Sequence, residues 1–462
     1  MLRKNDLCRV EITELNNLGF GVGRVDGMVM FVSHAVDGDV VEARVVRVAA
    51  GYAVGRTERI LSPSLHRVPS PCAAKGCGGC AYLTVSAAHE AEIKRESVAA
   101  AFARAGVSIR VNPLVTTGER YHYRNKAQYP VAAKKDGGVA IGFFAPKSHR
   151  VVEAEDCLLG DPAFSPILRC LHEWIDRYHI PPYREEDGSG LLRHIYLRAG
   201  KATGEILLVL VVNGAYLPRE EELVAELREK FPAIVGILLN RNEADTNVIC
   251  GEEYRTLWGK PYLRDVLCGV TLHLSPASFY QVNHDVAELL YRRARELAAL
   301  RGDELLLDLF CGVGSIGLSM ADGVREVIGM EIVESAVRCA SENAAQNGIR
   351  NASFYCGDAT DAEGLLAAAE RERGARILPD VVILDPPRRG CDAALLSYLA
   401  RLAPSRVIYI SCNPETLARD MKILAPLGYT AEEVTPFDLF PCTGHVEALV
   451  CLRRRADKEE MS

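Results

Sequence analysis

The chain has 462 residues, enough for two to four domains of ordinary size, each able to bury a core of its own. Hydrophobic residues make up 48% and charged residues 25%, which excludes a disordered, collagen-like or coiled-coil protein. The net charge of −7 excludes a uniformly basic nucleic-acid coat, although it allows a local basic patch.

The sequence contains no run of about 18 apolar residues, and its first residues lack the apolar segment of a secretory signal. We therefore expect a cytoplasmic protein without a membrane span. In that reducing compartment the 15 cysteines do not predict a disulfide framework, and a few of them are better explained as metal ligands or nucleophiles.

Residues 1–60 contain short valine-rich runs interrupted by turn sequences such as Gly-Phe-Gly-Val-Gly and Asp-Gly-Asp. Runs of this length between such turns predict four or five short strands, which favours a small barrel of the OB type. The segment is neutral, with eight basic and eight acidic residues.

Residues 61–150 are the basic part of the chain, with thirteen Lys and Arg against five Asp and Glu, a local balance of +8. Tyr121 and Tyr123 lie among these cations. Cations contact phosphates and aromatic rings stack on unpaired bases, so this mixture indicates an RNA-binding surface. The alternative is a solvated face with its tyrosines in the core.

Three cysteines of this segment, Cys72, Cys77 and Cys80, surround a Gly-Gly pair with spacings of four and two residues. Close thiols in a reducing compartment indicate a metal site rather than a disulfide. A [4Fe–4S] cluster needs four thiolates, and tetrahedral zinc can use the same four. Cys157, near the end of the basic segment, is the expected fourth ligand, and Cys170 is the alternative.

Strand-like runs and charged helical stretches fill residues 150–270 and predict an α+β layer without a motif of its own. From residue 285 to 451, six apolar runs alternate with amphipathic helices, which predicts a doubly wound, mostly parallel sheet. The expected fold class is α/β. The expected domains are a β-barrel, a central α+β domain that carries the cysteines, and a doubly wound domain, over residues 1–60, 61–270 and 271–455.

A strand followed by a glycine-rich turn lies at residues 306–317, where an apolar run ends in Asp308 and a helix begins near Ser315. Glycines let a ligand approach the backbone at the carboxyl end of such a strand. Glu331 ends the next strand and can accept hydrogen bonds from ribose hydroxyls, and Asp358 follows the third strand. This arrangement resembles the S-adenosylmethionine (SAM) site of class I methyltransferases. The alternative is a dinucleotide site, whose usual glycine spacing is absent.

Asp385 begins a rigid Asp-Pro-Pro-Arg loop that can carry its carboxyl toward the methyl group of the cofactor. Amino-group methyltransferases have an aromatic residue where this chain has Arg388, which argues against an adenine amino group as the target.

Cys412 ends the next strand. A buried cysteine is commonly a small hydrophobic residue, but at this edge a nucleophile is the better interpretation. A thiolate that adds to C6 of uracil makes C5 reactive enough to accept a methyl group. Glu447 can then remove the C5 proton, and His445 is the competing base.

Together these motifs resemble the RNA uracil-5-methyltransferase family, whose members make 5-methyluridine in ribosomal and transfer RNA. The resemblance covers nearly the whole chain and is carried by Asp-Pro-Pro-Arg, Ser-Cys-Asn-Pro and His-Val-Glu in that order. It implies that Cys412 is the nucleophile and Glu447 the general base. The residues that it assigns to SAM are Gln281, Phe310, Ser315, Glu331, Asp358 and Asp385.

The N-terminal β-domain resembles the TRAM module, an RNA-binding barrel. Cys72, Cys77, Cys80 and Cys157 match the iron–sulfur ligands of the family, although some members have five residues in the first gap. Both features are typical of the ribosomal-RNA branch, so we expect a monomeric enzyme that acts on 23S ribosomal RNA and holds a [4Fe–4S] cluster. Uridine 54 of transfer RNA is the alternative target.

Two alternatives belong to other classes of protein. Radical SAM methylthiotransferases also carry TRAM modules, but their Cys-x3-Cys-x2-Cys spacing differs from the one here. A non-catalytic RNA-binding protein is the other alternative, against which the presence of both Cys412 and Glu447 argues.

Overall fold

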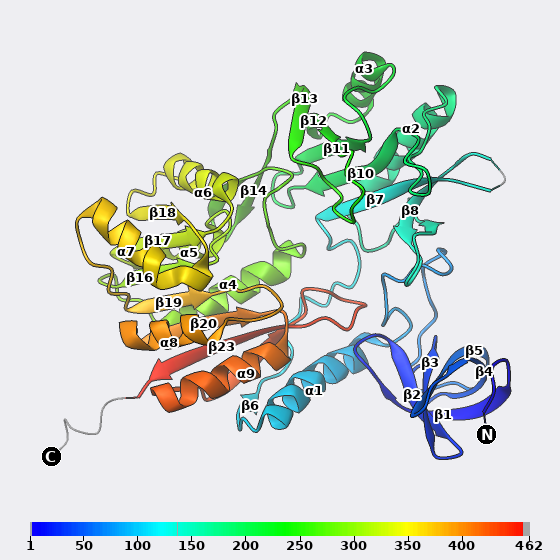
Figure 1. The fold of residues 1–462 in the computed structure, drawn as a ribbon, viewed down its shortest axis with the longest axis horizontal. Coiled ribbons are helices and arrows are strands. Elements are labelled where there is room, and N and C mark those ends of the chain that lie inside the picture. The colour runs from blue at the N-terminus through cyan, green and yellow to red at the C-terminus, as the bar shows by residue number, and fades with distance from the viewer. Residues whose placement is uncertain (1, 136, 456–462) are drawn as a thin grey trace.

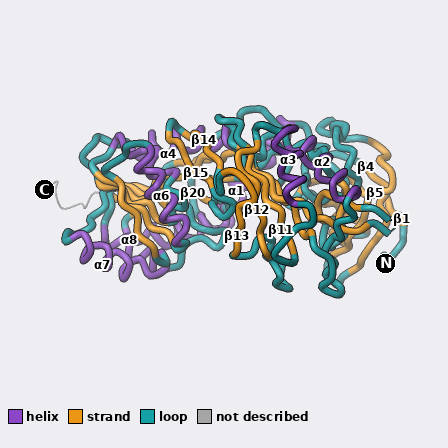
Figure 2. The backbone as a smooth tube through the Cα atoms, turned by 90° about the horizontal axis from the view of Figure 1, so that it is seen from above, coloured by secondary structure: helices purple, strands orange, loops and turns teal. Residues whose placement is uncertain are grey.

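The computed structural model describes residues 2–135 and 137–455. Three large sheets organise an elongated molecule (Figures 1 and 2), with the N-terminal barrel and the central sheet toward one end and the C-terminal sheet toward the other. Within the described ranges, no helix combines the length and the apolarity needed to cross a membrane.

The first sheet is a closed five-stranded barrel in the order β1-β2-β3-β5-β4. Successive side chains of a strand point to opposite faces, so alternate residues such as Val10, Ile12, Met30 and Val32 fill its interior. The strands are β1 (Leu7–Leu15), β2 (Phe20–Val25), β3 (Met28–Ser33), β4 (Val40–Val48) and β5 (Tyr52–Ser62). The expected small barrel is confirmed.

The central sheet has seven strands in the order β13-β12-β11-β10-β7-β8-β9, with one parallel pair, β11 and β12. Trp174 and Leu171 on α2 and Leu223 on α3 pack against it. The strands are β7 (Lys126–Ala133), β8 (Val139–Phe144), β9 (Val151–Glu153), β10 (Leu192–Ala199), β11 (Ile206–Val212), β12 (Ile234–Arg241) and β13 (Glu253–Gly259), and the helices are α2 (Phe164–Arg177) and α3 (Glu220–Lys230). A hairpin of β14 (Leu263–Leu267) and β15 (Val270–Leu274) follows.

The C-terminal sheet runs in the order β18-β17-β16-β19-β20-β23-β22-β6. Its first five strands are parallel, and β23 is antiparallel to β20, so the beginning of β23 lies at the edge where β20 ends. The strands are β6 (Arg110–Val111), β16 (Leu305–Leu309), β17 (Glu326–Glu331), β18 (Ala352–Cys356), β19 (Val381–Leu384), β20 (Arg406–Ser411), β21 (Tyr429–Thr430), β22 (Glu433–Phe437) and β23 (Glu447–Arg454). The six expected strands are all present, and the fold class is confirmed.

Helices cover both faces of this sheet (Figure 1). Leu306 and Ile383 pack with α4 and α5 on one face, whereas Leu305 and Leu307 pack with α1, α7, α8 and α9 on the other. The helices are α1 (Ala87–Ala105), α4 (His284–Ala298), α5 (Ser315–Met320), α6 (Glu334–Gln346), α7 (Ala362–Arg373), α8 (Ala393–Leu402) and α9 (Pro414–Leu424).

Part of the basic segment belongs to this distant sheet. Val98 and Phe102 on α1 are buried in the core beside α9, and β6 pairs in parallel with β22. The +8 segment is therefore not simply an exposed basic surface. The domain boundaries at residues 60/61 and 270/271 stay predictions.

Candidate active site

The pairing of β20 with β23 brings the predicted nucleophile and base together. Ser411 pairs with Ala448 in the antiparallel register, so the next two residues, Cys412 and Glu447, stand opposite each other at the end of the ladder. Glu447 is buried, with 4% of its surface exposed, and Cys412 is half-buried. Residues 35 positions apart in the sequence thus share one edge of the sheet.

Burial raises the pKa of the Cys412 thiol to about 11, the Glu447 carboxylate raises it too, and Arg388 opposes both effects. Burial, and then the nearby Asp385, hold the pKa of Glu447 well above its usual range, whereas Arg388 lowers it. Within the described part of the chain, Oε2 of Glu447 has no hydrogen-bond partner. The Cys412 thiol therefore favours its neutral form near pH 7, and burial also favours the neutral form of Glu447. Arg388 is the cation that favours the ionised forms of both groups.

His445, the competing base, lies beside the same arginine. Nη2 of Arg388 is 3.0 Å from Nδ1 of His445. Partial burial, and then Arg388, lower the pKa of His445. Its imidazole is therefore neutral near pH 7, and both possible bases remain at this edge.

The glycine-rich turn after β16 is held by the two carboxylates that the sequence places there. Glu331 accepts hydrogen bonds from the backbone amides of Gly312, at 3.1 Å, and Val333, at 3.0 Å. Asp308 is buried and accepts one from the amide of Gly317, at 2.9 Å, and burial raises its pKa to about 7. Two carboxylates thus fix the loop that the sequence predicts to bind the cofactor.

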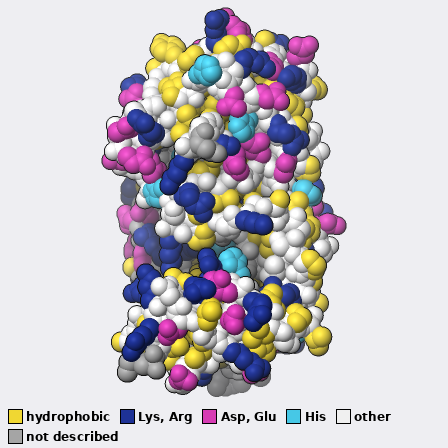
Figure 3. All heavy atoms as spheres, turned by 90° about the vertical axis from the view of Figure 1, so that its right-hand side faces the viewer, with side chains coloured by type: hydrophobic (Ala, Val, Ile, Leu, Met, Phe, Trp, Pro, Cys, Tyr) yellow, Lys and Arg dark blue, Asp and Glu magenta, His cyan; other side chains and the backbone are white. Residues whose placement is uncertain are grey.

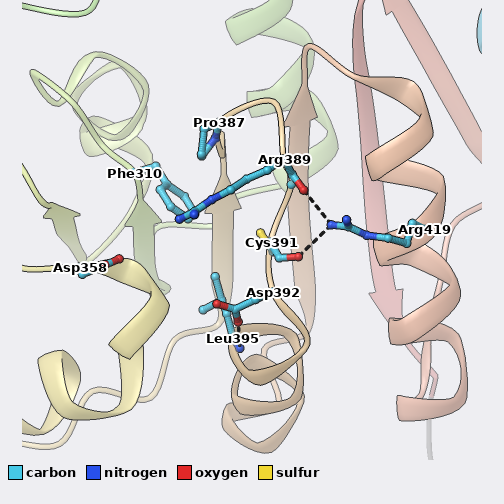
Figure 4. Close-up of a pocket in the computed structure, with 9 residues that line it drawn as sticks. Phe310, Asp358, Pro387, Arg389, Cys391, Asp392, Leu395 and Arg419 are labelled. Atoms are coloured by element: carbon cyan, nitrogen blue, oxygen red, sulfur yellow. Dashed lines mark hydrogen bonds between the residues drawn. The ribbon is translucent and has the colours of Figure 1, made fainter.

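A pocket of about 540 Å³ opens beside this turn (Figure 4). Phe310 and Asp358, two of the predicted cofactor residues, line it, and the side chain of Arg389 extends toward Phe310. Arg419 on α9 donates hydrogen bonds to the carbonyls of Arg389, at 2.9 Å, and Cys391, at 3.0 Å, and so fixes the loop that follows β19. The remaining lining residues are Pro387, Gly390, Asp392 and Leu395.

The structure also places the other predicted cofactor residues. Asp385 follows β19, and burial raises its pKa to about 7. Gln281 is buried ahead of α4, and its backbone carbonyl accepts a hydrogen bond of 2.9 Å from Nδ2 of Asn125. The hydroxyl groups of Ser315 and Tyr291 share a hydrogen bond of 3.1 Å. The sequence analysis missed Asn125 and Tyr291, because no motif precedes either of them and both contacts are long-range.

Comparison with known proteins decides the family. The model of the tRNA (Uracil-5-)-methyltransferase family matches residues 261–455, and the TRAM domain model matches residues 4–57. An uncharacterized RNA methyltransferase of Clostridium tetani is 37% identical over 99% of both chains, and one of Halalkalibacterium halodurans is 38% identical over 98% of both. This chain belongs to the RNA uracil-5-methyltransferase family. It is a SAM-dependent enzyme that acts on RNA.

A solved structure is similar to this methyltransferase over almost its whole length. It is the Pyrococcus abyssi tRNA (uracil-54, C5)-methyltransferase in complex with S-adenosyl-L-homocysteine. The two chains are 28% identical with a TM-score of 0.76, and the match covers 96% of this chain and 99% of the other. The predicted family, fold and enzyme class are confirmed.

The predicted metal ligands of the methyltransferase share one neighbourhood. Burial raises the pKa of the Cys80 thiol, and Cys157, Cys442, Cys77 and Cys72 each raise it further. Among the described residues, however, no three Cys, His, Asp or Glu side chains are close enough to hold a metal ion. Four thiols are the right donor set for a [4Fe–4S] cluster or zinc.

Cys170, the alternative fourth ligand, lies elsewhere. It is buried on α2 in the core of the central sheet, with its Sγ 3.7 Å from the Glu226 carboxylate. Cys80 and Cys157 pack in a different hydrophobic cluster, against Tyr123, Leu159 and Cys442.

Basic side chains of the methyltransferase lie both on its surface and in its interior. Lys and Arg side chains gather around a hollow on the face that carries the barrel and the central sheet (Figure 3). Within the basic segment, Lys94 is paired with Glu90 inside the protein and is only 1% exposed. Tyr123 is also buried and donates a hydrogen bond to the carbonyl of Pro441, so its predicted stacking on RNA bases is wrong; Tyr121 is half-buried.

Proposed function

We propose that this enzyme methylates C5 of a specific uridine in 23S ribosomal RNA through a covalent bond between Cys412 and C6 of the base. The observation that carries the proposal is the register of β20 and β23, which brings Cys412 and Glu447 to the same end of the ladder, where the Glu447 carboxylate raises the pKa of the thiol. When a uracil ring lies beside both groups, the thiol can bond to C6 and the carboxylate can remove the proton from the adjacent C5.

The reaction begins when Cys412 loses its proton to solvent and its sulfur bonds to C6 of the uracil. The electron pair of the C5–C6 double bond moves toward the C4 carbonyl, and C5 becomes nucleophilic. Bound SAM supplies a methyl group on a positively charged sulfur. C5 would take the methyl group as its bond to that sulfur breaks, and neutral S-adenosylhomocysteine would leave. Glu447 in its ionised form then removes the C5 proton, the C5–C6 double bond re-forms, and the sulfur of Cys412 leaves C6 as a thiolate. Arg388 favours the ionised forms of both protein groups that this sequence requires.

The proposed cofactor residues lie along the carboxyl edge of the sheet. Glu331 and the turn that it holds suit the ribose, and Phe310 and Asp358 line the pocket beside it. Asp385 carries a half-buried carboxyl that is suited to a cationic sulfur. Gln281 and Ser315 complete the proposed set.

We also propose that Cys72, Cys77, Cys80 and Cys157 hold a [4Fe–4S] cluster with a structural role. The shared neighbourhood of the four thiols and the separate location of Cys170 support this ligand set. The cluster would join the segment after the barrel to the segment that follows β9.

The barrel and the four cysteines favour ribosomal RNA as the substrate. Transfer RNA is the second candidate, because the Pyrococcus abyssi relative, which is similar over the whole length, acts on uracil 54 of tRNA. The deciding experiment maps 5-methyluridine in 23S ribosomal RNA and in transfer RNA from a strain with and without this gene. Loss of the modification from tRNA alone would contradict the ribosomal assignment.

The covalent step has its own test, in which the target uridine is replaced by 5-fluorouridine. The fluorine takes the place of the proton that Glu447 must remove, so the adduct persists on a denaturing gel. We expect adduct from the wild type and from the control Cys356→Ala, which removes an exposed thiol at the end of β18. We expect none from Cys412→Ala, and methylation by that variant at the wild-type rate would contradict the mechanism.

A further inference from the structure

Three buried charged residues and the half-buried Arg120 form an ion cluster outside the site described above. Nζ of Lys94 lies 2.7 Å from Oε1 of Glu90 and 2.6 Å from Oδ1 of Asp438, and Nη2 of Arg120 lies 2.8 Å from Oε2 of Glu90. Lys94, Glu90 and Asp438 are at most 6% exposed. We call these four residues the Lys94 cluster. Two cations balance two anions, which is the condition under which such burial is tolerated.

The Lys94 cluster also holds the backbone of one particular loop. Lys94 donates a hydrogen bond of 3.0 Å to the carbonyl of Phe440, and the amide of Cys442 donates one of 2.8 Å to Oε1 of Glu90. Together with the ion pair between Lys94 and Asp438, these bonds attach every second residue at the start of the loop 438–446 to α1, namely Asp438, Phe440 and Cys442. Hydrogen bonds to charged groups are stronger than neutral ones, so this attachment is firm.

The same loop leads directly into Glu447. It connects the end of β22 to the beginning of β23, where Phe437 and Glu447 are paired. Oε2 of Glu447 has no hydrogen-bond partner in the part of the chain that the structure describes. The position of its carboxyl therefore depends on the position of the backbone at Glu447, the first residue of β23. The Lys94 cluster holds the loop that comes directly before this residue.

We propose that the Lys94 cluster positions Glu447 for removal of the C5 proton, with Lys94 and Glu90 as positioning residues that act through the loop 438–446. The proposal rests on the proposed role of Glu447 as the base. Loss of the Lys94 charge leaves Asp438 without its cation beside Glu90, which keeps only Arg120, and the loop must shift to separate or hydrate the two carboxylates. The step that depends on Glu447 should slow more than the step that depends on Cys412.

The test compares two reactions of Lys94→Met. With RNA that contains 5-fluorouridine, we expect adduct to form at the wild-type rate, because that step uses Cys412. With unmodified RNA, we expect kcat to fall between about tenfold and 10²-fold and a methylated covalent adduct to accumulate, with KM for RNA and SAM within about twofold. Lys94→Arg should restore much of the activity, since it restores the cation.

Arg104→Met is the matched control on the same helix, because Arg104 pairs with Glu415 on the surface, and it should behave as the wild type. Glu90→Gln is the second variant, which keeps a side chain that can accept from the Cys442 amide and serves if Lys94→Met does not fold. The positioning role is overturned if Lys94→Met and Glu90→Gln both turn over unmodified RNA at the wild-type rate. It is also overturned if adduct formation and turnover slow equally. Failure of the wild type to form any adduct overturns the covalent mechanism instead, and the positioning role with it.

Discussion

Asp385 should give the enzyme an affinity for SAM that depends on pH. Burial raises the pKa of this carboxyl to about 7, and its charge also affects Glu447 and Cys412. SAM carries a positive charge on its sulfur, and S-adenosylhomocysteine does not. An ionised Asp385 near that sulfur stabilises SAM, whereas the protonated form does not, so SAM affinity should rise as the pH rises through 7.

The size of the effect follows from the pKa. A carboxyl with a pKa of about 7 is about one-tenth ionised at pH 6 and about nine-tenths ionised at pH 8, so the affinity for SAM should increase about tenfold over this range. The affinity for S-adenosylhomocysteine should change much less. Asp385→Asn carries no charge at either pH, so it should lose this increase and bind SAM at least about tenfold more weakly than the wild type at pH 8.

Isothermal titration calorimetry at pH 6, 7 and 8 with both ligands measures these affinities. Asp308→Asn is the matched control, because Asp308 is also buried with a pKa of about 7 but is bound to the amide of Gly317. In that variant the affinity for SAM should still rise with pH more steeply than the affinity for S-adenosylhomocysteine, because Asp385 is intact. A wild-type ratio of the two Kd values that is constant from pH 6 to 8, or a ratio that still changes in Asp385→Asn, would refute the reasoning.

Three further predictions concern the base, the RNA and the cluster. Glu447→Gln cannot accept a proton, so turnover should fall by about 10²–10⁴-fold and a methylated RNA adduct should appear on a denaturing gel; normal turnover without adduct would assign the base role to another group. Replacement of Arg124 and Lys126, two cations of the basic segment, by Gln should weaken RNA binding and leave the affinity for SAM unchanged. The slope of log Kd against log salt should fall by about 0.7 for each phosphate that the protein no longer binds, and an unaltered slope contradicts a role of these two cations in RNA binding. Cys157→Ser should lower the iron and sulfide content of anaerobically purified protein while Cys170→Ser retains it, and zinc in place of iron in the wild type would exclude the cluster.

The sequence predicts the C-terminal sheet well where its strands are buried on both faces. Such strands are continuous apolar runs, as in β16 and β20, and each run can be recognised without knowledge of its neighbours. Strand β22 was missed because Thr435 and Pro436 interrupt its apolar pattern. Strand β6 has only two residues and pairs with a strand more than 300 residues away, so nothing local indicates it.

The candidate site shows the same limit. The motif order selects Cys412 and Glu447, but only the register of β20 and β23 sets them opposite each other. Composition identifies a basic segment and cannot separate cations that face solvent from a buried one such as Lys94, because its partner Asp438 lies 344 residues further along the chain. Tyr123 was misjudged for a similar reason, since the loop that buries it also comes from the end of the chain.

The placement of α1 has a consequence for how the protein is made. During synthesis this helix leaves the ribosome long before α9, β22 and the loop 438–446 that cover it, so Val98 and Phe102 must remain without their final partners until most of the chain exists. The early helix is then an exposed apolar surface on an unfinished chain, which is where chaperones bind and where aggregation begins. Contacts between such distant segments also close slowly. A stop codon shortly before residue 438 would therefore leave both ends of the protein unfinished, because the first helix and the last strands complete each other.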